Sequence, residues 1–197
     1  MTDYQQLKKA LERKNYLFFD DRDYNLNLVG VRSDDNRSGQ FNDRLMVAFK
    51  QHGAELCFSF AFTTDPGVYW RENPMHVDGT AVVVPGQYRG LWRIGSHQGL
   101  YEALTQTKRV TVARDNNRDS VAEIDGEHQT GIFGINLHRA HQRKKIKEVE
   151  KWSAGCQVVA DPDEYAILMG VCRKAAKLWG NSFTYTLIEE GDLWPEK

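Results

Sequence analysis

One histidine and one cysteine lie close enough in this sequence to serve a single active site. His138 follows the apolar run 132–137, and Cys156 comes after a basic connection, in a turn that begins with the small residues 153–155. A free thiol has a pKa of about 8.5 and is mostly protonated at neutral pH, so a neighbouring imidazole is needed to take its proton. The pair therefore predicts a thiolate nucleophile made by a histidine base, which is the chemistry of acyl transfer.

The residues around the cysteine fit the other needs of that chemistry. The small Ala154 and Gly155 leave the backbone N–H groups of Gly155 and Cys156 free to face the oxyanion that forms on a substrate carbonyl. A third group must hold the imidazole in the right tautomer. The sequence leaves open whether this group is a backbone carbonyl or a carboxylate, with Asp115 and Asp119 as loop candidates.

Two elements are expected to position the pair. The alternation and β-branched content of the apolar run before His138 predict a strand that delivers the imidazole at its C-terminal end. After the cysteine, Asp161 is suited to cap a helix, Pro162 to occupy its first position and Glu164 to follow three residues after the cap. These signals predict a long helix that ends at about Trp179.

The rest of the chain reads mainly as strands, with one short amphipathic helix at residues 4–14. Turn residues predict one hairpin around His52-Gly53 and another around Pro85-Gly86. We therefore predict a mainly β fold of the α+β class, organised as one domain over residues 1–197 with the helix at 1–14 as an appendage. The expected strands are 16–19, 26–31, 44–50, 55–62, 80–84, 88–94, 109–114 and 183–188.

Composition narrows the partners of the protein. A hydrophobic content of 41% over 197 residues is enough for a real core, and a formal net charge of −1 gives no general electrostatic reason to expect nucleic-acid binding. No apolar run approaches the roughly 20 residues of a membrane span, so we expect no membrane-spanning segment. The polar N-terminus lacks the features of a secretory signal, which predicts synthesis in the cytoplasm.

Several residues have competing interpretations. His141 lies three residues after His138, so a metal site that also uses Cys156 is an alternative, but it lacks a fourth ligand and a helical frame. We therefore expect neither a metal nor another cofactor. Aromatic residues such as Trp70 either line a substrate groove or pack in the core. His97 lies in a glycine-containing turn, where a surface histidine is the simpler interpretation.

The segment with the two reactive residues resembles the L,D-transpeptidase catalytic domain family. The signature of that family is a histidine, a spacer of about fifteen residues and then Ser/Thr-His-Gly-Cys. This sequence has His138, the spacer 139–152 and then Ser153-Ala154-Gly155-Cys156. Upstream, residues 63–67 and 85–88 are similar to the family's Thr-Gly and Pro-Gly-x-Tyr/Phe strand ends.

The resemblance implies a β-sandwich or barrel with a few peripheral helices, in which Cys156 attacks a peptide carbonyl of the peptidoglycan stem. It implies that His138 is the base and that Ser153 and Gly155 shape the turn and the oxyanion hole. Water or an amine would then resolve the thioester, by hydrolysis or by crosslinking. We assign further substrate contacts to Tyr88, Arg139, Gln157 and Trp70.

Three departures from the family pattern concern the neighbours of the pair. Ala154 replaces the second histidine of the motif, Arg139 replaces a small residue, and 157–158 replace an apolar residue followed by Arg or Asn. The missing signal peptide favours a phage endolysin released through a holin, or an effector carried by a secretion machine, and so favours hydrolysis in the cell wall over crosslinking. The oligomeric state is not predicted.

Two other functions compete with this one. The altered residues Ala154 and Gln157 also suit a non-catalytic phage or injection-particle structural protein that retains the fold as a binding module. A cysteine peptidase or amidase that acts on a substrate outside the cell wall would use the same pair of residues.

Overall fold

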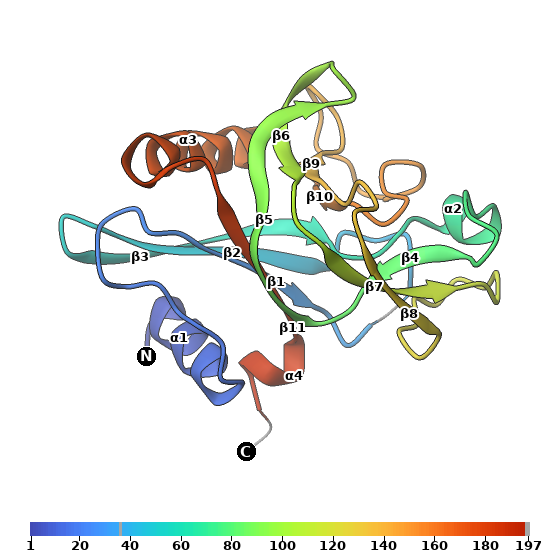
Figure 1. Cartoon of the computed structure of the whole chain (residues 1–197), viewed down its shortest axis with the longest axis horizontal. Coiled ribbons are helices and arrows are strands. Elements are labelled where there is room, and N and C mark those ends of the chain that lie inside the picture. The colour runs from blue at the N-terminus through green and yellow to red at the C-terminus, as the bar shows by residue number, and fades with distance from the viewer. Residues whose placement is uncertain (36, 196–197) are drawn as a thin grey trace.

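The computed structural model describes residues 1–35 and 37–195, and its fold is mainly β (Figure 1). The four helices assigned in this part are α1 (Asp3–Arg13), α2 (Val68–Glu72), α3 (Pro162–Trp179) and α4 (Glu190–Leu193). The strands are β1 (Asn27–Arg32), β2 (Asp43–Gln51), β3 (Ala54–Thr63), β4 (Thr80–Val83), β5 (Gly86–His97), β6 (Tyr101–Gln106), β7 (Val110–Asp115), β8 (Glu127–Gly131), β9 (Leu137–Arg139), β10 (Gln157–Val159) and β11 (Phe183–Glu189).

The strands form a closed barrel and a separate small sheet. The barrel order is β1-β11-β5-β6-β9-β10-β3-β2, and the small sheet has the order β4-β7-β8. Two neighbouring pairs of the barrel are parallel, β1 with β11 and β9 with β10. The mainly β class predicted from the sequence is therefore confirmed, and the barrel brings β9 next to β10, the two strands that flank the reactive residues.

Alternating apolar side chains fill the barrel, and α3 closes one side of it (Figure 1). In β2, Leu45, Val47 and Phe49 point inward, as the two-residue period of a strand requires. In α3 the buried residues recur at helical spacing, and Leu168 and Cys172 pack against the barrel core. The Asp161 side chain accepts a hydrogen bond from the backbone N–H of Asp163, which confirms the predicted start of this helix.

A second, smaller core lies outside the barrel. Leu7, Ala10 and Leu11 of α1 are fully buried and contact a cluster that includes Val31 of β1 and Met46 of β2. The predicted N-terminal helix is confirmed, and it packs on the outer face of the barrel (Figure 1). Within the described ranges, no helix is both long enough and apolar enough to cross a membrane.

One predicted hairpin is confirmed and one is wrong. His52 and Gly53 both have positive φ angles, and Gln51 pairs with Ala54, so β2 and β3 are joined by a two-residue turn of the expected kind. By contrast, β4 pairs with β7 of the small sheet and not with β5. Every residue of β4 is buried, and its backbone forms hydrogen bonds with β7 in the small sheet. In the barrel, β5 pairs with β11 and β6.

The strand predicted at 16–19 is also wrong. This segment is irregular, and the backbone groups of Leu17 and Phe19 form hydrogen bonds with the side chains of Gln87 in β5 and Asn27 in β1, respectively. The N–H of Phe19 donates to Asn27 Oδ1 at 2.8 Å, and Asn27 Nδ2 donates to the Phe19 carbonyl at 2.9 Å. Side-chain amides of residues distant in the sequence therefore replace a neighbouring strand, which no local pattern in 16–19 could reveal.

Candidate active site

The turn before Cys156 is fixed by Ser153 and Gly155. Ser153 is fully buried; its Oγ donates to the Cys156 carbonyl at 2.7 Å and accepts from the Gly155 N–H at 3.2 Å. Gly155 has a φ of +122°, and a Cβ at this position would lie 2.6 Å from the Ala81 carbonyl oxygen. Only glycine fits this turn, because any side chain would both strain the backbone and collide with β4.

One of the two predicted oxyanion donors is therefore occupied. The Gly155 N–H already donates to Ser153 Oγ, so the expectation that it faces a substrate is wrong. Within the described residues, the Cys156 backbone N–H has no hydrogen-bond acceptor. The Cys156 amide is thus the donor of this turn that remains for an oxyanion.

The parallel pairing of β9 and β10 places the histidine and the cysteine on two adjacent segments of the barrel. Leu137 pairs with Gln157 and His138 pairs with Val158, so Cys156 comes directly before the strand that lies beside the histidine. The predicted long strand before His138 is wrong, because residues 132–136 are irregular. His138 is the middle residue of a three-residue strand, and the positive φ of Gly134 interrupts the apolar run.

A backbone carbonyl holds the imidazole. His138 is buried, and its Nδ1 lies 2.9 Å from the carbonyl oxygen of Arg139. The Tyr101 hydroxyl donates to the same carbonyl at 3.2 Å. The two carboxylate candidates lie elsewhere, since Asp115 and Asp119 both pair with the buried Arg71. The carbonyl makes Nδ1 the protonated nitrogen, which leaves Nε2 free to accept a proton.

A second histidine packs against the first. The rings of His97 and His138 are stacked, with centroids 4.1 Å apart and an interplanar angle of 21°. The amide nitrogen of Asn136 lies 3.2 Å from His97 Nδ1, and its amide oxygen accepts from the Gln106 N–H. His97 is buried, so its interpretation as a surface-loop histidine is wrong. Neither Tyr101 nor Asn136 was found from the sequence, because strand pairing alone brings them to the histidine.

The thiol and the imidazole are both neutral at neutral pH. The Cys156 Sγ contacts the Gly134 carbonyl at 3.4 Å, and burial raises the pKa of this thiol to about 11, although the Asn136 N–H lowers it in part. Burial and then the neighbouring His97 lower the pKa of His138 to about 4. The pair is therefore an uncharged acid and an uncharged base, between which a proton must move for the thiol to become nucleophilic.

Residues close to the thiol line two hollows. Ala154, two positions before Cys156, lines one of them, and His138 lines the other. The apolar hollow, of about 220 Å³, is lined by Trp70, Met75, Arg114, Phe133, Ile135 and Ala154 among others. The basic hollow, of about 670 Å³, is lined by His97, Tyr101, His138, Arg139, Lys151 and Trp152 among others.

Comparison of the chain with protein-family models, with curated proteins and with solved structures found no match. The resemblance to the L,D-transpeptidases therefore rests on the residues 138–156 and on the strand ends named above.

The four predicted substrate contacts separate into two groups. Trp70 lines the apolar hollow and Arg139 lines the basic hollow, so both lie where a substrate could reach them. Tyr88 instead donates its hydroxyl to the Val84 carbonyl at 2.5 Å and packs against the barrel core. Gln157 is fully buried and accepts from the Tyr185 hydroxyl at 2.6 Å, so its assignment to substrate binding is wrong.

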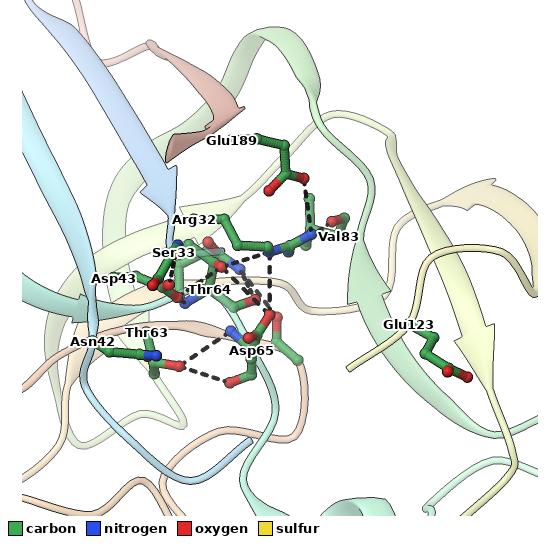
Figure 2. Close-up of polar contacts among 12 residues, drawn as sticks. Arg32, Ser33, Asn42, Asp43, Thr63, Thr64, Asp65, Val83, Glu123 and Glu189 are labelled. Atoms are coloured by element: carbon green, nitrogen blue, oxygen red, sulfur yellow. Dashed lines mark hydrogen bonds and ion pairs between the residues drawn. The ribbon is translucent and has the colours of Figure 1, made fainter. Parts of the chain in front are cut away.

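Gln157 joins the turn before Cys156 to a buried network of charged groups. Its Nε2 lies 3.3 Å from the Thr64 carbonyl and 3.4 Å from the Gly155 carbonyl. Figure 2 shows the network, in which Arg32 lies between Asp65 and Glu189 and contacts Thr64. Burial raises the pKa of Asp65 to about 7, although Arg32 opposes the shift. These residues support the turn from inside the barrel.

No group of three or more His, Cys, Asp or Glu side chains in the described ranges is arranged to hold a metal ion. His141, which the metal alternative requires, instead accepts the backbone N–H groups of Arg143 and Lys144 at its Nδ1. Its ring therefore organises the basic loop.

Proposed function

We propose that this protein is a cysteine acyl-transfer enzyme that acts on peptidoglycan stem peptides, with hydrolysis as its main outcome. The observation that supports the reaction type is the 2.9 Å contact between His138 Nδ1 and the Arg139 carbonyl, beside the strand that follows Cys156, because it leaves Nε2 as the proton acceptor. The substrate class rests on the resemblance of residues 138–156 to the L,D-transpeptidases. The hollow lined by Ala154 and the hollow lined by His138 are the cavities in which parts of a stem peptide would lie.

The acylation step uses groups of this chain alone. Cys156 Sγ attacks the carbonyl carbon of the peptide while Nε2 of His138 takes the thiol proton, and the Cys156 N–H stabilises the oxyanion. When the C–N bond breaks, the leaving amine takes that proton from Nε2. The products of this step are a thioester on Cys156 and a free amine.

Hydrolysis returns the enzyme to its starting state. Water attacks the thioester carbon and gives a proton to Nε2 of His138. The C–S bond then breaks, the acyl group leaves as a carboxylic acid, and the thiolate of Cys156 recovers its proton. If an amine of another stem attacks in place of water, the same thioester gives a crosslink.

The test is to incubate the protein with a synthetic stem tetrapeptide and with purified cell-wall sacculi. We expect mass spectrometry to find shortened stems, and an acyl adduct on Cys156 when the reaction is stopped in acid. Cys156→Ala, which removes only the sulfur atom, should show neither result. Absence of both products and adduct with the unaltered protein would contradict the proposed function.

The pH profile of kcat/KM is a further prediction. The imidazole must be neutral to accept a proton, and its pKa is lowered to about 4, so activity should fall about tenfold per pH unit only below that value. His97→Asn should move this acid limb to higher pH, because His97 helps to lower the pKa of His138. Circular dichroism at each pH separates titration from unfolding. An acid limb near pH 6.5 in the unaltered protein would contradict this assignment.

The second candidate is a binding function. It is favoured by the raised pKa of Cys156, because a thiol that stays neutral and donates to the Gly134 carbonyl is a poor nucleophile unless a base takes its proton. In this case the protein would retain the fold and bind wall fragments unchanged. The same incubation decides between the two functions, since a binding protein would sediment with sacculi while every stem keeps its mass.

A further inference from the structure

Arg139 carries a positive charge that is positioned but unpaired. Its Cζ lies 3.9 Å from the centroid of the Tyr101 ring and 5.9 Å from that of Tyr165, and the side chain lines the basic hollow. Within the described residues, no carboxylate forms an ion pair with Arg139 and no acceptor receives its side-chain N–H groups. Stacking on Tyr101 thus holds the guanidinium in place while its donors stay available.

Two histidines that line the hollow are fixed as hydrogen-bond donors. His97 Nδ1 lies 3.2 Å from the amide nitrogen of Asn136, whose amide oxygen accepts from the Gln106 N–H, so this Nδ1 is an acceptor. His141 Nδ1 accepts two backbone N–H groups of the basic loop. A neutral imidazole that accepts at Nδ1 carries its proton on Nε2. Among the residues that the structure describes, none forms a hydrogen bond with either Nε2, so each ring keeps an unused N–H donor.

The other polar groups of the hollow add a second cation and no acid. Lys151 lines the hollow with its Nζ 4.0 Å from the Tyr69 ring centroid, and Gln98 and Gln142 supply amide groups. No aspartate or glutamate is among the described residues that line this hollow. Lys151 also lines a neighbouring hollow that contains three glutamates, so Arg139 is the stronger of the two cationic contacts. The hollow is therefore complementary to an anion.

The donors and the size of the hollow select the kind of anion. A phosphate monoester has three acceptor oxygens and close to two negative charges at neutral pH, whereas a carboxylate has two oxygens and one charge. Two cations and two imidazole N–H groups therefore suit a phosphate better. The volume of about 670 Å³ exceeds that of a phosphate, and Leu100 and Trp152, both partly exposed, line it with apolar surface. An organic group joined to the phosphate would fill this part.

We propose that the basic hollow is a binding site for a phosphate monoester of a small organic molecule. Arg139 would hold two phosphate oxygens through parallel hydrogen bonds, and the Nε2–H groups of His97 and His141 would donate to the phosphate. This inference does not rest on the proposed function, because Cys156 does not line the hollow and no bond is made or broken in the binding step.

The test compares phenyl phosphate with benzoate, which share the ring and differ in the anionic group. Isothermal titration calorimetry at pH 8 and low ionic strength measures both affinities. The unaltered protein and Cys156→Ala should bind phenyl phosphate equally, and both should bind benzoate at least tenfold more weakly. Arg139→Gln should weaken the binding of phenyl phosphate about 10- to 100-fold, and Lys151→Gln should weaken it less. Arg143→Gln, in the same basic loop but outside the hollow, should bind like the unaltered protein.

A second measurement needs no variant. Phenyl phosphate should shift the Nε2 resonances of His97 and His141 in the imidazole ¹⁵N spectrum of the unaltered protein. The resonances of His52 and His128, which do not line the hollow, should stay in place. Absence of a shift at both His97 and His141 would overturn the site even if Arg139→Gln did not fold.

Three results of the calorimetry would also contradict the proposal. Equal affinities for phenyl phosphate and benzoate would remove the selection for a phosphate. Equal losses in Arg139→Gln and Arg143→Gln would show that the charge of the whole loop, and not the hollow, attracts the anion. Inorganic phosphate should bind more weakly than phenyl phosphate, because it leaves the apolar part of the hollow empty; equal binding of the two would overturn the assignment of an organic monoester.

Discussion

Replacing His138 with glutamine is expected to lower kcat/KM at pH 7 by about three to four orders of magnitude. Without the base, turnover depends on the fraction of Cys156 that ionises by itself. Because burial raises the pKa of this thiol to about 11, that fraction is about one in ten thousand at pH 7. The remaining activity of His138→Gln should therefore rise about tenfold with each pH unit, whereas the unaltered protein should be nearly flat from pH 6 to pH 9.

The measurement is steady-state kinetics with the synthetic stem tetrapeptide from pH 6 to pH 9. The rate at which iodoacetamide alkylates Cys156 is measured over the same pH range. His52→Asn is the matched control, because His52 lies at the tip of the β2–β3 hairpin in a positive-φ position that asparagine tolerates. This control should keep full activity. A small effect of His138→Gln, or a residual activity that does not depend on pH, would refute the role of His138 as the base.

Replacing Arg32 with methionine is expected to lower the free energy of unfolding by about 3–5 kcal/mol at pH 8. Arg32 is buried and its Nε lies 3.2 Å from Asp65 Oδ1, so the variant leaves a buried carboxylate without its cation. Asp43 cannot compensate, since it accepts from the N–H groups of Ser33 and Thr64 and is itself negative when ionised. The variant removes the charge that Figure 2 shows at the centre of the network.

The stability lost in Arg32→Met should depend on pH, in a direction set by the pKa of the Asp65 carboxyl group. Burial raises the pKa of Asp65 to about 7 in the folded protein, against about 3.9 in an unfolded chain. An acid with a raised pKa contributes stability that is present below pH 4 and is lost as the pH rises through 7. Loss of Arg32 raises this pKa further, so the difference between variant and unaltered protein should be largest at pH 8 and smaller at pH 5.

Urea unfolding at pH 5 and pH 8 measures the effect. Adding Asp65→Asn to Arg32→Met should recover part of the lost stability at pH 8, because the carboxylate that lies 3.2 Å from Arg32 Nε is then replaced by a neutral amide. Arg93→Met, at an exposed position of β5, should change stability by less than about 0.5 kcal/mol. If Arg32→Met unfolds like this control, the buried network is not important for stability.

Local signals predicted the elements whose ends are determined by neighbouring residues. The helix α3 begins where Asp161 and Pro162 indicated, and the β2–β3 hairpin turns at His52-Gly53. Both depend on backbone conformations that a few adjacent side chains favour or forbid. The strand that carries His138 was predicted too long, because the single positive φ of Gly134 ends the regular structure of an otherwise β-like run.

The inward direction of Gln157 could not be predicted. All three residues of β10 are buried, so hydrophobic alternation cannot say which side chains face the barrel interior. The structure decides it by pairing Gln157 with Leu137, and the polar group is satisfied by Tyr185 and Thr64. For this reason the sequence alone suggests a substrate contact where a glutamine next to a candidate nucleophile is in fact buried.

By itself the sequence determined the two candidate reactive residues, the mainly β class and the capped helix that follows the turn. These features depend on residue type and short spacing, which are local properties of the sequence and do not depend on contacts with distant segments. Only the tertiary structure decided that a backbone carbonyl holds His138, that the His97 ring stacks on it, and that the Arg139 guanidinium lies over the Tyr101 ring. These contacts join strands that are distant in the sequence, and the pairing that closes the barrel is not encoded in any one segment.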